Sequence, residues 1–122
     1  MIHTQKQDEG MRAMHVDMSH GGVLSTTNQQ YAIKEAEDFL ARIRHVVDTA
    51  YLHLDVQTQK ETNQALQSYR WRALLVTNRG RYYADDWSFG ALQSLKNVLD
   101  KVEQQMTNRL GKLEAQHAAL FV

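Results

Sequence analysis

Cysteine and proline are both absent from this chain of 122 residues. Without cysteine, the chain can form neither a disulfide framework nor a thiolate metal site. Without proline, nothing in the sequence interrupts long helices. An excess of charge of one sign is lacking as well, because 14 Lys and Arg residues balance 14 Asp and Glu residues. Contact with a polyanion would therefore depend on local basic patches and not on the net charge.

Targeting signals and catalytic signatures are also missing. The N-terminal stretch 1–10 is polar and of mixed charge, unlike a signal peptide, and no apolar run approaches the ~20 residues of a membrane span. We therefore expect a cytoplasmic protein. There is no Gly-x-Ser-x-Gly elbow and no phosphate-binding glycine loop. The sequence thus predicts a protein that is not an enzyme and needs no cofactor.

Apolar periodicity outlines the first half of the fold. Residues Met11–Met18 and Ala50–Val56 alternate between apolar and polar side chains, which is typical of half-buried strands. Between them, Thr27–Arg44 carries an apolar stripe at helical spacing, with Ser, Thr and Thr at 25–27 as alternative N-caps. The polar stretch Gln57–Ser68 has no period and is interpreted as a long mobile connection.

The second half is predicted as a hairpin followed by a long helix. Tyr69–Val76 and Arg81–Ala84 have strand character, and Asn78 and Gly80 suit the tight turn between them. Asp85 and Asp86 are interpreted as the start of the helix, where carboxylates favour the exposed amides. The apolar stripe of this helix comprises Phe89, Leu92, Leu95, Leu99, Val102, Met106, Leu110 and Leu113.

The resulting order is β-α-β-β-β-α, in a single α+β domain over residues 11–122 with residues 1–10 as a flexible arm. Each strand has one apolar face, which favours a four-stranded sheet with both helices packed on one side. The stripe of the long helix also fits heptad positions, so a coiled-coil partner is the structural alternative. Either the long helix or the apolar tail Leu120–Val122 would then support a homo-oligomer.

Motifs near the C-terminus resemble the ribosome-hibernation family, which includes the hibernation-promoting factors and the ribosome-associated inhibitor. The matching text is Asp86-Trp87, Gly90-Ala91-Leu92 and Asp100-Lys-Val-Glu-Gln-Gln-Met106, with Arg109 and Lys112 beyond it. The link between the first helix and the second strand, 43–56, fits the family as well, and the resemblance covers roughly residues 13–113. The chain departs from the family at Gln104 and Asn108, where basic residues are common, and at Trp87, where Tyr is common.

The resemblance implies a fold like that of a double-stranded-RNA-binding domain and a stress-response role in the cytoplasm. It implies binding to the small ribosomal subunit and its rRNA, which silences translation by occupation without chemistry. Cations on the long helix and in the hairpin are the candidate phosphate contacts, against the alternative of ordinary solvated faces. These candidates are Lys101, Arg109, Lys112, Arg70, Arg72, Arg79 and Arg81.

Two short repeats, His15-Val-Asp17 and His53-Leu-Asp55, raise a metal hypothesis. Alternation places each His and Asp on one face of its strand, and all four would converge if the strands are neighbours. Hydrogen bonding across an exposed sheet face is the commoner explanation, so no metal is assigned.

The aromatic residues near the hairpin (Tyr82, Tyr83, Trp87 and Phe89) are interpreted as core packing and not as a base-stacking platform. The neutral net charge and the missing cations at Gln104 and Asn108 keep an alternative function open. In that alternative, the same fold serves as a non-ribosomal protein-interaction module.

Overall fold

The computed structural model describes residues 14–60 and 67–119, with side chains to Glu114. Its element order is β-α-β-β-β-α, as the periodicity predicts. The predicted arm, the first three residues of the predicted first strand (11–13), part of the connection after the second strand and the apolar tail lie outside the described residues. The elements are β1 (Met14–Ser19), α1 (Thr26–Ile43), β2 (Ala50–Lys60), β3 (Gln67–Thr77), β4 (Gly80–Ser88) and α2 (Ala91–Ala119).

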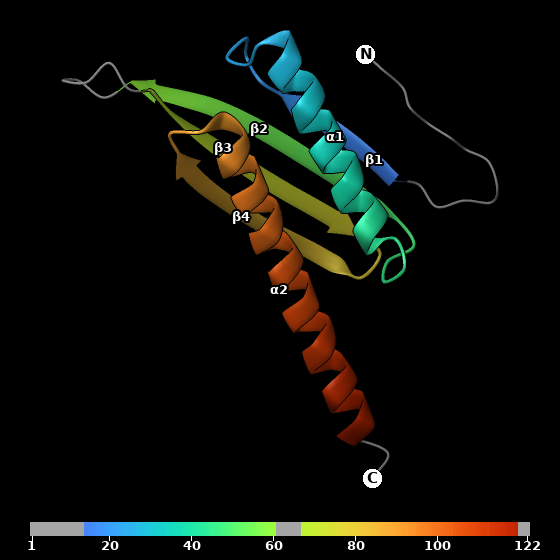
Figure 1. Ribbon diagram of the computed structural model, residues 1–122. Helices are drawn as coiled ribbons and strands as arrows, with labels where there is room; N and C mark the ends of the chain where they lie inside the picture. Colours follow the sequence, from blue (N-terminus) through green and yellow to red (C-terminus); the bar gives the residue numbers. More distant parts are fainter. Residues whose placement is uncertain (1–13, 61–66, 120–122) are drawn as a thin grey trace.

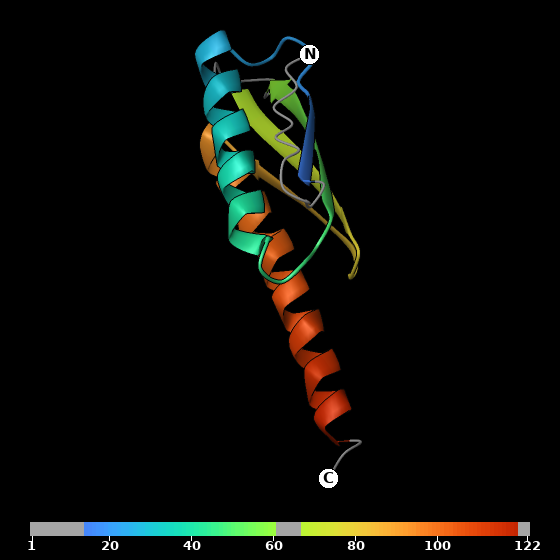
Figure 2. The ribbon, with the colours of Figure 1, turned by 90° about the vertical axis from the view of Figure 1, so that its right-hand side faces the viewer.

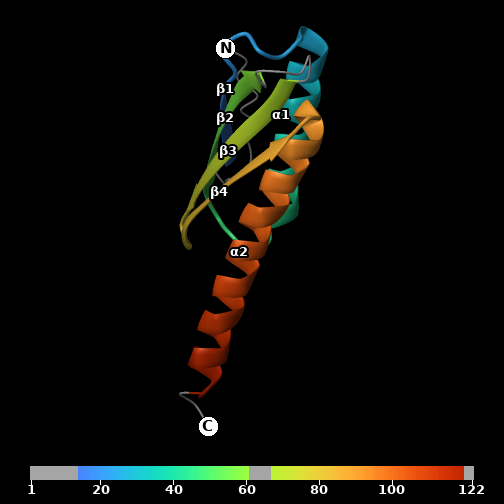
Figure 3. The same ribbon diagram turned by 90° about the vertical axis from the view of Figure 1, so that its left-hand side faces the viewer.

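The four strands form one mixed sheet in the order β1-β2-β3-β4. β1 runs parallel to β2, with Val16 opposite Leu52, and α1 makes the crossover between them. β2, β3 and β4 are antiparallel neighbours. Both helices lie on the same side of this sheet, which leaves its other face, here called the outer face, without a helical cover (Figures 2 and 3). The predicted α+β fold class is therefore confirmed.

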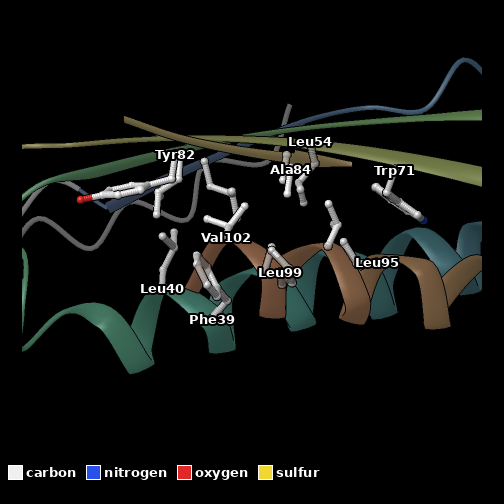
Figure 4. Packing of buried hydrophobic residues seen from close by; sticks show 14 of the residues in the cluster. Phe39, Leu40, Leu54, Trp71, Tyr82, Ala84, Leu95, Leu99 and Val102 are labelled. Atoms are coloured by element: carbon white, nitrogen blue, oxygen red, sulfur yellow. The ribbon is translucent and has the colours of Figure 1, made fainter. Parts of the chain in front are cut away.

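The core fills the space between the sheet and the two helices. Leu54, Trp71 and Ala84 point from the strands toward Phe39 of α1 and Leu99 of α2 (Figure 4). The helices present their apolar stripes to this layer, because residues three and four apart share one side of a helix. Phe39 is fully buried in this layer.

Local signals fix the first helix at both ends. Ser25 is the N-cap, and its hydroxyl accepts a hydrogen bond from the amide of Asn28 at 3.1 Å. The choice among residues 25–27 that the sequence left open is thus resolved. Arg44 is the C-cap, and Ala50 then begins β2, as predicted.

The strands are longer than the sequence indicated. β2 continues to Lys60 and β3 begins at Gln67, so all of the described part of the expected mobile connection is paired strand. Asp85 and Asp86 belong to β4 and not to a helix start, which is a second correction. Both carboxylates are held by cations from neighbouring elements, and such partners are invisible to local sequence rules.

The second helix begins at Ala91 and continues well past the end of the sheet (Figure 1). Its buried stripe runs from Leu95 to Leu110, whereas Leu113 is 45% exposed beyond the sheet. Phe89 was predicted to belong to this stripe. It lies before the helix and is 61% exposed, so that prediction is wrong. No helix in the described part of the chain is long and apolar enough to cross a membrane.

Candidate functional site

The outer face of β3 and β4 carries arginine and aromatic side chains in register. Arg70 lies opposite Trp87, with its guanidinium 5.5 Å from the ring centroid. The same guanidinium donates to the carboxylate of Asp85, one of the acids expected to start the helix. This hydrogen bond, more than the opposing effect of burial, lowers the pKa of Asp85 below its ordinary value. The charge of Arg70 is therefore compensated within the chain.

Arg72 is compensated in the same way. Its Nη2 lies 2.6 Å from Oδ2 of Asp55 on the neighbouring strand β2, and its Nε lies 3.1 Å from the same oxygen. The hydrogen bond with Asp55, followed by its negative charge, raises the pKa of the arginine. Two of the predicted phosphate contacts are thus ion-paired residues of the outer face.

The β1–β2 end of the outer face holds the two His-x-Asp repeats. His15 stacks on Tyr51, with ring centroids 5.2 Å apart. Asp17 accepts from the Tyr51 hydroxyl at 3.1 Å and lies 2.9 Å from Nδ1 of His53. Burial, and then the hydrogen bond with Asp17, raise the pKa of Tyr51. The pairing register places His15 opposite Tyr51, and Asp55 pairs with an arginine of β3.

The predicted convergence of all four His and Asp side chains is therefore wrong. Parallel pairing puts Asp17 opposite His53, which leaves His15 and Asp55 displaced along their strands. Within residues 14–60 and 67–114, no group of three His, Cys, Asp or Glu side chains could hold a metal ion.

One flank of α2 lies along the free edge of β4. Lys101 donates to the Asp85 carbonyl at 3.1 Å and forms an ion pair of 2.9 Å with Asp86. Asn97, one turn earlier, donates to the same Asp86 carboxylate, and Gln105, one turn later, donates to the Tyr83 carbonyl at 2.8 Å. Residues four apart on the helix thus face residues two apart on the strand, because each of these spacings advances along its element by about 6 Å. Lys101 is the third predicted phosphate contact whose charge is compensated.

The hairpin turn lies beside the middle of α2. A Cβ on Gly80 would lie 3.1 Å from Nη1 of Arg109, whose guanidinium is 6.0 Å from the ring centroid of Tyr82. Arg79 donates to the Val46 carbonyl at 3.3 Å, and no acid among the described residues pairs with it. Asn78 holds this turn against the loop before β2 by accepting from the amides of Asp48 and Thr49.

Four of the predicted cations form no ion pair with any residue that the structure describes. Two come from the hairpin and two from α2, where Arg109 lies beside the turn residue Gly80. We call this set the hairpin–helix cluster. Its members are Arg79, Arg81, Arg109 and Lys112, all exposed.

Sequence reasoning placed several aromatic residues incorrectly. Tyr82 is buried, as expected, but Tyr83 is 51% exposed and Trp87 is 46% exposed on the outer face. Alternation along β4 explains this result, because neighbouring residues point to opposite faces. Asn97 was missed as a partner of Asp86, and its place four residues before Lys101 is the signal that could have identified it.

The family model described as "Hibernation factor Hib, C-terminal domain" matches residues 15–119. The chain belongs to this family. Membership of a hibernation-factor family implies ribosome binding and regulation of translation. The resemblance found in the closing helix is thereby confirmed at the level of the family.

A solved structure supports the fold. A ribosomal subunit interface protein from Coxiella burnetii is similar over 80% of this chain and 99% of its own, with 18% identity and a TM-score of 0.55. The N-terminal domain of Thermus thermophilus Protein Y is similar over 78% of this chain and 93% of its own, with 14% identity and a TM-score of 0.48. No curated protein matches the chain.

Proposed function

We propose that this hibernation factor binds the small ribosomal subunit in the cytoplasm and inhibits translation by occupying rRNA, without catalysing a reaction. The observation that supports this proposal is the hairpin–helix cluster, where four cations have no acidic partner among the described residues. Phosphate oxygens of RNA are the natural partners of such cations.

Charge compensation separates the seven candidate contacts into two groups. Arg70, Arg72 and Lys101 already face carboxylates, so an approaching phosphate would have to displace an acid. The cluster residues pay no such cost, because they face water and neutral groups. We infer that the cluster makes the main phosphate contacts and that the three paired cations chiefly hold strands and helix together.

Neutral net charge is compatible with this proposal. Binding to RNA depends on the number of phosphates that are neutralised locally, and each contact makes the affinity depend on salt. Beside the hairpin turn, the Asp48 carboxylate accepts a hydrogen bond from the Asn78 side chain at 3.5 Å and forms no ion pair with a described cation. Contacts to phosphate and to 2′-hydroxyl groups require no base-specific code.

Co-sedimentation with purified small subunits over a range of salt concentrations tests the proposal. The double variant Arg81→Gln/Lys112→Gln removes two cluster charges that have no side-chain hydrogen bond or ion pair among the described residues. We expect binding to weaken and the slope of log affinity against log salt to fall by about 1.5 to 2. The matched control is Lys34→Gln/Lys60→Gln, which removes two exposed cations on α1 and at the far end of β2.

Equal losses in the two double variants would refute the role of the cluster, because binding would then follow total charge alone. Binding that ignores salt altogether would refute phosphate contact. Wild-type protein that fails to sediment with small subunits at low salt would refute the proposed target itself.

A second candidate function follows from the outer face. Tyr83 and Trp87 are exposed there beside arginines whose charges are neutralised by Asp55 and Asp85. Exposed aromatic and arginine side chains with balanced charge are typical of protein interfaces. A protein partner held by this face would stay bound after nuclease treatment and would be lost with Trp87→Ala, whereas Lys112→Gln on α2 would still bind it.

A further inference from the structure

The two edges of the sheet differ. The edge of β4 is occupied by α2, whose Lys101 and Gln105 donate to the backbone carbonyls of Asp85 and Tyr83. β1 is the strand at the opposite edge, and none of the hydrogen bonds found among the described residues joins a side chain to the backbone of Met14–Ser19. An unpaired strand edge offers a row of amides and carbonyls that another strand can complete.

The inner face of β1 is also incompletely covered. Met14, Val16 and Met18 pack against the core but remain half-buried, whereas Leu52 and Leu54 on the adjacent strand are fully buried. The contact of α1 with β1 therefore leaves part of the surface of these three side chains open. A further strand beside β1 would bury these three side chains.

The sequence of β1 specifies which strand fits. Val16 is at the centre of a nearly symmetric pattern. Methionines lie two residues away on either side, at 14 and 18, and His15 and Asp17 are its immediate neighbours. When the histidine is protonated, these two neighbours carry opposite charges. We propose that β1 pairs with β1 of a second copy of this chain, antiparallel and centred on Val16. In this register Val16 lies opposite Val16, Met14 opposite Met18, and His15 opposite Asp17 of the other copy.

The faces to which the paired side chains point support this arrangement. In antiparallel pairing, directly opposite residues point to the same face, so the methionines meet on the inner face and the histidines meet the aspartates on the outer face. Asp17 can accept the extra donor, because Tyr51 and His53 both bind Oδ2 and no described residue binds Oδ1. A two-fold axis through Val16 makes both His–Asp contacts at once.

This interface is independent of the proposed ribosome function. It uses the β1 edge of the sheet, whereas the hairpin–helix cluster comes from the β3–β4 hairpin and α2. A strand of six residues buries little surface, so the pair is weak and forms at high protein concentration. Sedimentation velocity over a wide concentration range measures it. We expect the mass of the wild type to rise from that of a monomer toward that of a dimer.

Two charge variants test the register. His15→Asp places two aspartates opposite each other, and Asp17→His places two histidines opposite each other, so each variant should associate at least about tenfold more weakly than the wild type. A mixture of the two variants restores both His–Asp contacts in a mixed dimer and should recover association. Gln104→Glu adds a negative charge on the exposed side of α2, away from β1, and should associate like the wild type.

Recovery in the mixture shows that both variants keep the strand folded, so it separates loss of contact from loss of structure. The proposal is overturned if the wild type stays monomeric at its highest soluble concentration. It is also overturned if His15→Asp associates as strongly as the wild type, or if mixing the variants recovers nothing.

Discussion

Changing Lys101 separates a structural role from an RNA-binding role. The ammonium group lies 2.9 Å from a carboxylate oxygen of Asp86, whose side chain is only 16% exposed, and 3.1 Å from the Asp85 carbonyl. A hydrogen bond to a charged group contributes about 1.5 to 3 kcal/mol when buried, and an exposed ion pair contributes about 0.2 to 1 kcal/mol. The lysine side chain is 51% exposed, so the lower end of the combined range applies.

We therefore expect Lys101→Met to lower the free energy of unfolding by about 1 kcal/mol. Asp86 keeps its hydrogen bond from Asn97, which limits the loss. For a domain of this size, the melting temperature should fall by about 3 to 5 °C. Urea denaturation followed by Trp fluorescence measures the free energy, and differential scanning calorimetry measures the shift.

Lys112→Met is the matched control. This lysine is exposed on the same helix and makes no ion pair with the described residues, so its loss should leave stability within about 0.5 kcal/mol of the wild type. In this variant, the slope of log affinity for the ribosome against log salt should instead fall by the amount expected for the loss of about one phosphate contact. The slope should change less in Lys101→Met. The opposite result would be an unchanged stability and a larger loss of binding for Lys101→Met. It would refute the inference that ion-paired cations are structural and unpaired cations bind phosphate.

Three further outcomes follow from the geometry, each measured by chemical denaturation. Trp71→Phe should cost about 1 to 2 kcal/mol, because the buried indole donates to the first carbonyl of α2 at 2.6 Å; a neutral effect would contradict this role. Gly80→Ala should cost about 1 to 2 kcal/mol, because φ is 129° there and a Cβ would lie 3.0 Å from a tyrosine hydroxyl. For Asp85→Asn, the lowered pKa of the carboxylate means that its stabilisation is complete above the ordinary Asp pKa of about 3.9 and is lost as the pH falls through the lowered value. The difference in stability between wild type and Asp85→Asn should therefore shrink in acid, and a difference that does not change with pH would argue against the ion pair with Arg70.

The order of the elements was predictable because short-range periodicity carries it. Alternation in Ala50–Val56 and the three-and-four spacing from Leu95 to Leu110 both depend on residues close in sequence. The ends of β2 and β3 were not predictable in the same way. Their outer parts are polar and are held by the ladder between the two strands, which joins Lys60 to Gln67.

The candidate site was predictable in composition but not in arrangement. All seven cations were found from the sequence, yet Arg70, Arg72 and Lys101 turned out to face Asp85, Asp55 and Asp86. Those partners are 15 to 17 residues distant in sequence, and they meet through the strand register and the packing of α2 against β4. Helix-start preferences gave Asp85 and Asp86 a local explanation, and the tertiary ion pairs outweighed it.

The side chains that α2 lays along β4 also limit how far copies of this protein can assemble. A sheet with two open margins can take up strands on both sides and grow into a filament without end. Here Lys101 and Gln105 occupy backbone acceptors on one margin, so among the described strands the β1 margin is the one that the proposed pairing uses. Joining two such copies uses up both β1 margins, and growth stops at a closed pair, which allows the protein to accumulate at high concentration without forming fibres.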